Sequence, residues 1–132
     1  MNYFMDKKLS KHAAAGIVGN LYAESGLRTD AIGDGGTSGG IAQWHGPRWE
    51  QLKAFAKARN KKWTDLDLQL DFIWHELNSN YSSTYAKLLK AKNSDEAANI
   101  WGHDYERFKG YNNFNHSNYI KRRNYAKQFY NS

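Results

Sequence analysis

Residues 13–31 read AAAGIVGNLYAESGLRTDA, and residues 37–52 read TSGGIAQWHGPRWEQL. The first stretch opens as an amphipathic helix, because four apolar residues follow the i, i+3, i+4, i+7 spacing of a single helical face. These residues are Ala14, Ile17, Val18 and Leu21. Ser10 is placed to cap the start of this helix, and Gly26 is placed to end it in the left-handed conformation. We therefore predict a helix over residues 11–25.

Glycine dominates the segment that follows. Seven of the eleven glycines of the chain lie between Gly26 and Gly46. Such a density of glycine excludes a long helix and indicates a turn-rich loop or a small β-hairpin.

Helix signals return after Pro47, which fits the first turn of a helix to about Arg59. Thr64 is expected to cap a helix with the buried stripe Leu66, Leu70, Ile73 and Leu77. Three more helices are predicted over about residues 83–92, 94–107 (opening at Ser94) and 118–130. Six helices and one glycine-rich segment predict a mainly α fold. The length of 132 residues suits a single domain.

Charge and composition narrow the possible partners. The formal net charge is +6 and aromatic residues make up 15% of the chain. A positive surface suits nucleic acid, a membrane surface, or a bacterial wall carrying carboxylates and phosphates, and surplus aromatic rings suit sugars or bases. Cysteine is absent, no apolar run approaches a membrane span, and the first twelve residues lack the apolar core of a signal peptide.

Glu24 is the leading catalytic candidate. It lies three residues after Leu21 and seven after Ile17, so a continuing helix places it on the apolar face. Burial and the negative end of the helix dipole both raise a carboxyl pKa, and a glutamic acid that stays protonated is suited to general acid catalysis. The ordinary alternative is a surface glutamate paired with Arg28.

The two quoted stretches resemble the phage tail lysozyme family. The hallmark is a GN-x-x-x-ESGL helix followed by a GxxQW segment and an arginine, here residues 19–27, Gly40 to Trp44, and Arg48. The resemblance covers nearly the whole chain and implies a lysozyme-like fold, with the glycine-rich segment beside a cleft. It also implies that Glu24 is the catalytic acid.

Further site residues follow from the resemblance. Gln43 would hydrogen-bond sugar, unless it is a solvated loop amide. Trp44 would stack against sugar or, as is usual for tryptophan, pack in the core. Arg48 would steady a substrate carboxylate, unless it is a plain surface charge. Tyr105, Glu106 and Tyr111 would shape the far wall of the cleft, with ordinary packing as the alternative.

A second carboxylate is less clearly marked. Asp30 and Asp34 both follow Glu24 on the glycine-rich segment, and Asp34 is the better placed. However, GDGG is also a plain turn sequence. Because lytic transglycosylases work with one glutamate, both hydrolysis and transglycosylation stay open. The five histidines show no metal-ligand spacing, so neither metal nor cofactor is predicted.

The sequence therefore predicts cleavage of the β-1,4 bond between N-acetylmuramic acid and N-acetylglucosamine in peptidoglycan. The alternatives are a wall-binding module without catalysis and a basic nucleic-acid binder, which only the charge supports. We expect action at the bacterial wall, from a phage tail or outside the cell, without nucleic acid or membrane insertion. Residues 1–132 are expected to form one catalytic domain, either a module joined to other domains of a tail or lysin protein or a stand-alone lysin.

Overall fold

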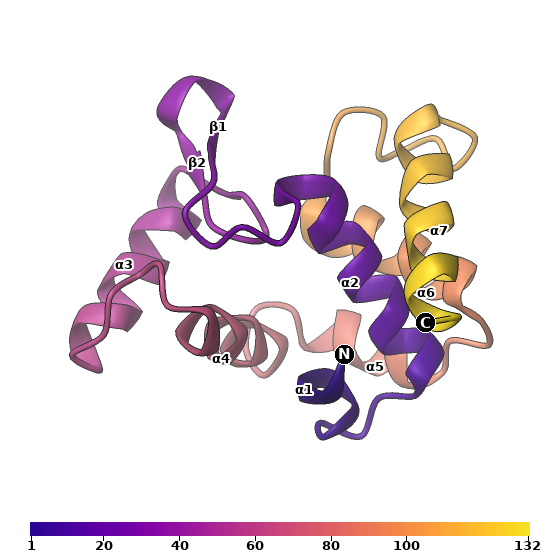
Figure 1. The fold of residues 1–132 in the computed structure, drawn as a ribbon, viewed down its shortest axis with the longest axis horizontal. Coiled ribbons are helices and arrows are strands. Elements are labelled where there is room, and N and C mark those ends of the chain that lie inside the picture. Colours follow the sequence, from indigo (N-terminus) through magenta and orange to yellow (C-terminus); the bar gives the residue numbers. More distant parts are fainter.

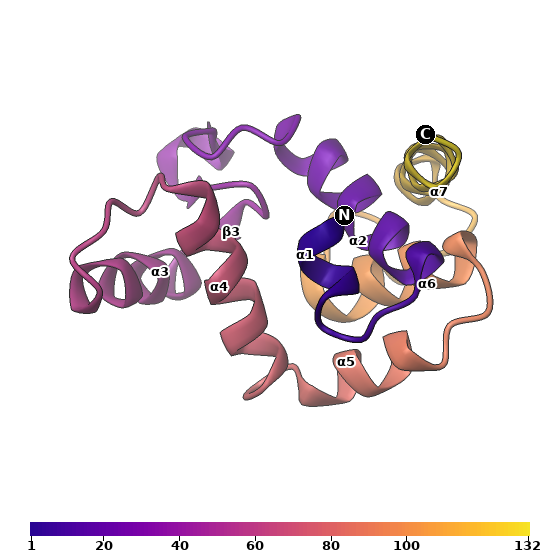
Figure 2. The same ribbon diagram turned by 60° about the horizontal axis from the view of Figure 1, so that its bottom comes forward.

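The computed structural model describes residues 1–132, and the fold is mainly helical. The helices are α1 (Asn2–Met5), α2 (Lys11–Ser25), α3 (Pro47–Ala58), α4 (Leu66–Leu77), α5 (Ser82–Leu89), α6 (Ser94–Trp101) and α7 (Ser117–Tyr130). A turn of π-helix, η2 (Gly102–Glu106), extends α6. Helix α2 packs with α6 and α7 on one side of the molecule, and α3, α4 and a small sheet form the other side (Figures 1 and 2).

Helix α2 has the boundaries and caps that its sequence predicts. The Ser10 side chain accepts a hydrogen bond from the amide of Ala13 at 3.2 Å, and Gly26 ends the helix in the left-handed conformation with φ 65°. Two glycines of the helix mark where its neighbours approach. A Cβ on Gly16 would lie 2.5 Å from the Ala97 side chain of α6, and one on Gly19 would lie 2.6 Å from the backbone of Ala126 in α7. The GN motif thus includes the contact surface for α7.

The glycine-rich segment forms a three-stranded antiparallel sheet of two-residue strands. These are β1 (Ile32–Gly33), β2 (Ser38–Gly39) and β3 (Trp44–His45), in the order β1-β2-β3, and the 3₁₀ turn η1 (Asp34–Gly36) joins the first two. Ser38 pairs with Gly33 on one side and with His45 on the other. The expected hairpin is therefore present, with a third strand added.

Helix α4 differs from its prediction at its start and in its buried face. Asp65, not Thr64, is the cap, and it accepts the Leu68 amide at 2.9 Å. Leu66 is 50% exposed, because the helix turns two polar residues inward instead. Gln69 accepts a hydrogen bond from the Ile41 amide and donates to the carbonyls of Thr29 and Trp63. The second inward polar residue, Glu76, belongs to the cluster described below.

The other helices lie close to their predicted ranges. Asn93 caps α6 in place of Ser94, accepting the Glu96 amide at 2.8 Å. The predicted continuation of this helix towards Arg107 is a π-turn, and Arg107 ends it with φ 50°. Turns of π-helix occur frequently at functional sites. This one leads directly into the wall of a cleft.

Candidate active site

A polar cleft of about 700 Å³ lies where the C-terminal end of α2, the β-sheet and the segment after η2 meet. The end of α2 points between the β1–β2 hairpin and the loop that leads to α7 (Figure 1). The cleft is lined by Glu24, Asp34, Thr37, Gln43, His45, Glu106, Arg107, Phe108 and Lys109. Of the residues predicted for the site, the fold brings Glu24, Asp34 and Gln43 together here.

Glu24 occupies the base of this cleft in the last turn of α2. Its side chain is only 16% exposed, and its Oε1 accepts a hydrogen bond from Nη2 of Arg122 in α7 at 2.8 Å. Burial raises the pKa of Glu24, and the nearby charge of Asp34 raises it further, whereas the Arg122 guanidinium lowers it. Burial is the largest of these effects, so the pKa of Glu24 is above its ordinary value.

Arg122 is itself held in place by the GN motif. Its Nη1 donates to the Asn20 side-chain oxygen at 3.0 Å, and the Asn20 amide nitrogen donates to the carbonyls of Gly16 and Ala98. Asn20 is fully buried. A chain of hydrogen bonds therefore runs from the interface of α2 and α6, through Asn20 and Arg122, to Glu24.

Asp34 lies on the hairpin wall of the cleft. It adopts φ 52°, a left-handed conformation in which a non-glycine residue is strained. Its Oδ2 accepts a hydrogen bond of 2.6 Å from the Ser38 hydroxyl, and Nδ1 of His45 lies 2.9 Å from the same hydroxyl. Because the hydroxyl proton points to Asp34, the histidine is the donor in the second contact. The carboxylate is 68% exposed but is held at one point by Ser38 and His45.

Gln43 also faces the cleft, and its amide nitrogen is used within the hairpin. This nitrogen donates to the carbonyls of Ala31 and Gly40 at 3.0 and 2.9 Å. Ser25, the other polar residue of the ESG sequence, donates its hydroxyl to the Ile41 carbonyl at 2.8 Å. The two motifs are therefore joined directly, which fixes the sheet relative to the end of α2.

Glu106 lines the cleft. From the sequence alone, this role could not be told apart from ordinary packing at the end of a helix. Both of its carboxyl oxygens are buried, and neither has a hydrogen-bond partner. Burial raises the pKa of Glu106 well above the ordinary value, and the negative charge of Glu24 raises it further. The cleft thus holds two carboxyl groups with raised pKa values, and only Glu24 has an arginine partner.

Trp44, Arg48 and Tyr105 lie behind the cleft and do not line it. All three converge on Glu76 of α4, whose Oε1 accepts from Nε1 of Trp44 at 2.9 Å and from the Tyr105 hydroxyl. Arg48 donates to both oxygens of Glu76, at 2.9 and 3.0 Å. Trp44 and Tyr105 are buried, so the places expected for them at the sugar site are corrected to packing in the core. Arg48 is committed to Glu76 and offers no free guanidinium to a substrate carboxylate.

Tyr111 lies outside the main cleft, in a shallower recess of about 400 Å³. The two hollows share Arg107, Phe108 and Lys109, so Tyr111 lies on an extension of the same wall. Asp30 and Arg28 are exposed and belong to neither hollow. The partner of Glu24 is therefore Arg122, 98 residues away, and not Arg28.

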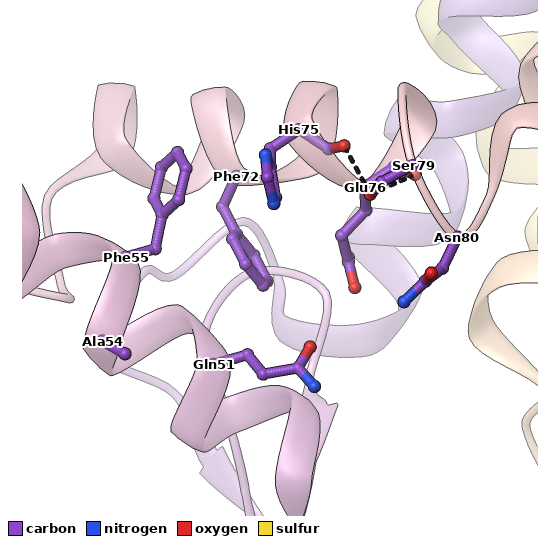
Figure 3. Close-up of a pocket in the computed structure, with 8 residues that line it drawn as sticks. All are labelled: Gln51, Ala54, Phe55, Phe72, His75, Glu76, Ser79 and Asn80. Carbon is purple, nitrogen blue, oxygen red and sulfur yellow. Dashed lines mark hydrogen bonds between the residues drawn. The ribbon is translucent and has the colours of Figure 1, made fainter.

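A further recess, of about 340 Å³, opens between α3 and α4, on another face of Glu76. Figure 3 shows the side chains of Gln51, Glu76 and Asn80 turned towards its interior, with Phe55 and Phe72 at one end. The only carboxylate here is that of Glu76, which already accepts hydrogen bonds from Trp44, Arg48 and Tyr105. This recess therefore lacks a free acid or base, and the cleft at Glu24 is the stronger candidate.

No group of three or more histidine and acidic side chains is arranged to hold a metal ion. None of the helices combines the length and the apolar character that crossing a bilayer demands.

Two important residues, Glu76 and Arg122, were not identified from the sequence. Glu76 and Arg122 each lie on a helix that also carries exposed charged residues, and their partners are far away in the chain. A charged residue in phase with the buried residues of its helix is the one available clue, since Glu76 follows Ile73 by three positions and Phe72 by four.

A small helical domain with a short antiparallel sheet, in which a buried glutamic acid closes one helix at the base of a polar cleft, is a lysozyme-like domain. The comparison with known families agrees. The family described as phage tail lysozyme matches residues 1–132, the whole chain, and the chain belongs to this family. No curated protein matches the chain. Family membership indicates a lysozyme-like role in peptidoglycan cleavage and a phage-tail context.

Proposed function

We propose that this chain is a muramidase, which cleaves the β-1,4 bond between N-acetylmuramic acid and N-acetylglucosamine, with Glu24 as the general acid. The observation that carries the proposal is the environment of Glu24: a buried carboxyl with a raised pKa at the base of a cleft, near the exposed carboxylate of Asp34. A general acid must hold its proton near the working pH, and burial is the standard means of achieving this.

Glu24 donates its proton to the glycosidic oxygen as the bond between this oxygen and the anomeric carbon breaks. Positive charge develops on the sugar ring, and Asp34, on the facing wall, stabilises it. A water molecule then adds to the anomeric carbon and gives a proton to Glu24, which restores the acid and completes the hydrolysis. Ser38 and His45 hold the Asp34 carboxylate, which limits the rearrangement needed during the reaction. The amide nitrogen of Gln43 already donates to the carbonyls of Ala31 and Gly40. Its side-chain oxygen is therefore the group that accepts a hydrogen bond from the sugar.

The second candidate is lytic transglycosylation of the same bond. In this reaction one glutamate suffices, and the acetamido group of the substrate assists. The exposure of Asp34 favours this alternative, because a solvated carboxylate stabilises charge less strongly than a buried one. Either reaction acts on the bacterial cell wall, from the phage tail or outside the cell, and we propose that residues 1–132 form one catalytic domain for it.

The test is Glu24→Gln. Glutamine retains an oxygen that accepts from Arg122 but carries no acidic proton, so the fold survives and wall cleavage falls by about 10²–10⁴-fold or more. Turbidity clearance of purified walls measures the loss, and circular dichroism verifies the fold. A folded variant that clears walls within about tenfold of the parent would show that another group is the acid.

Asp34→Asn separates the two reactions. If Asp34 stabilises the charged sugar, we expect the Asp34→Asn variant to lose activity partly or largely. Mass spectrometry of the fragments that the parent enzyme releases should then show reducing ends. Asparagine tolerates the same turn conformation, so loss of fold is not expected. Full activity together with anhydro ends would remove Asp34 from the mechanism and identify a transglycosylase.

A further inference from the structure

A basic recess lies at the corner between α3 and α4, away from the cleft. It has a volume of about 460 Å³, and four lysines and one tryptophan line most of it: Lys53, Lys57, Lys61, Lys62 and Trp63. No acidic residue lines it. This corner and α7 lie at opposite ends of the molecule in both views (Figures 1 and 2). A ligand bound here would leave the cleft open.

The backbone at this corner brings the four lysines together. Beyond the end of α3 at Ala58, Asn60 adopts the left-handed conformation, φ 56°, and the Lys61 amide donates back to the carbonyl of Ala56 at 3.0 Å. Lys61 and Lys62 therefore return beside Lys57, instead of continuing away from the helix. The wall formed by Trp63 is fixed, because its ring packs edge-on against Trp49 at 5.4 Å and its carbonyl accepts from Gln69.

The charge of the recess is not neutralised within the protein. Lys57, Lys61 and Lys62 are exposed and form no ion pair, and only Lys53 has an ion-pair partner, Glu50 at 3.3 Å. Lys57 lies in the last turn of α3, where the negative end of the helix dipole favours a positive charge. Lys61 and Lys62 lie beyond the helix, so the dipole does not explain their presence. The three unpaired lysines around this hollow repel one another, so their grouping does not stabilise the fold. An anion bound in the recess would remove the repulsion.

We propose that this recess binds the phosphodiester groups of an anionic polymer of the bacterial wall, and so holds the enzyme on its substrate. Lysine binds phosphate as a point charge without demanding fixed geometry, which suits a flexible polymer. The partly exposed Trp63 ring offers an apolar face to the carbon linkers between phosphates. The choice of a wall polymer over nucleic acid rests on the proposed function, because the cleft would act on glycan in the same wall.

The test uses binding, which is independent of cleavage. In the Glu24→Gln protein, the double variant Lys61→Gln/Lys62→Gln is compared with Lys90→Gln/Lys92→Gln. Both pairs are exposed, follow the end of a helix and form no ion pair, so the two variants lose equal charge. The recess variant should bind intact walls about tenfold more weakly than the parent, and the control should bind nearly as the parent does.

The same binding measurement is repeated on walls from which hydrofluoric acid has removed the phosphodiester polymers. On these walls the difference between the two double variants should disappear. With Glu24 restored, both should cleave a soluble glycan oligomer at the parental rate. Equal binding by both variants on intact walls would overturn the proposal, as would a difference that persists on stripped walls or a larger difference on duplex DNA. If no oligomer is cleaved while the binding difference remains, the proposed muramidase fails and the wall-docking recess stands.

Discussion

The cleft contains two buried carboxyl groups, Glu24 and Glu106, which differ in their hydrogen-bond partners. Arg122 donates a hydrogen bond to Glu24, which lowers the free energy of its ionised form, whereas the oxygens of Glu106 have no donor at all. Glu24 therefore ionises first, and its charge then opposes the ionisation of Glu106. The raised pKa favours the protonated form of Glu106, so its titration affects stability.

Replacement of Glu106 should change how stability depends on pH. In the unfolded chain a glutamate titrates near 4.5, and burial raises the pKa of Glu106 well above this in the folded protein. The stability that comes from protonated Glu106 is complete below the unfolded pKa and declines as the pH rises towards the folded one. Glu106→Gln removes this decline, so its melting temperature relative to the parent should be higher at pH 7 than at pH 4.

Thermal melts at the two pH values measure the effect. Glu50→Gln, which removes a carboxylate that is 72% exposed on α3, is the control and should show little pH dependence relative to the parent. An offset between Glu106→Gln and the parent that is the same at both pH values would mean that Glu106 titrates alike in the folded and unfolded states.

At the scale of elements, α2 organises the site, since it carries Glu24 at its end, Asn20 along its buried face, and the two glycines that admit α6 and α7. Helix α7 contributes Arg122, and the sheet contributes Asp34. The distance between α2 and α7 therefore decides whether Arg122 reaches Glu24.

Gly19→Ala should separate these two helices. Its Cβ would lie 2.6 Å from the backbone nitrogen of Ala126, which cannot move without the helix, so we expect a loss of about 1–3 kcal/mol in the free energy of unfolding. Catalysis should fall as well, because Arg122 is displaced. Gly26→Ala is the comparison: its Cβ meets no atom within 4 Å, and only the φ of 65° is unfavourable, at about 1 kcal/mol.

Urea denaturation and wall clearance measure the two effects of Gly19→Ala. If its unfolding free energy and activity match those of the parent, the α2–α7 approach is looser than the structure indicates.

For the whole molecule, the net charge of +6 and the position of the basic recess lead to a prediction about salt. Exposed charges more than about 10 Å apart are largely screened at 0.1 M salt, whereas chemistry inside a cleft is screened far less. Whole-wall lysis should therefore drop severalfold between low and high ionic strength, mainly through slower association. Cleavage of a short soluble glycan oligomer should change little across the same series. Equal losses on both substrates would place the salt effect in the cleft or in the stability of the fold.

The sequence alone determined the features that depend on local periodicity and turn chemistry. Helix α2 with its caps at Ser10 and Gly26, the other predicted helices to within a few residues, and the small sheet after them all follow from spacing and glycine content. The position of Glu24 on an inward helical face follows in the same way, since neighbours three and four residues apart share one face.

Tertiary structure alone decided which polar residues meet. The hydrogen bond from Arg122 to Glu24 and the enclosure of Glu106 join segments that are distant in the chain, and no periodicity within either segment encodes the contact. The same holds for Glu76, which accepts hydrogen bonds from Trp44, Arg48 and Tyr105 behind the cleft, away from the sugar site that the family resemblance implied for them. A buried charge is stable only if a partner reaches it, and the packing of the helices decides which partner that is.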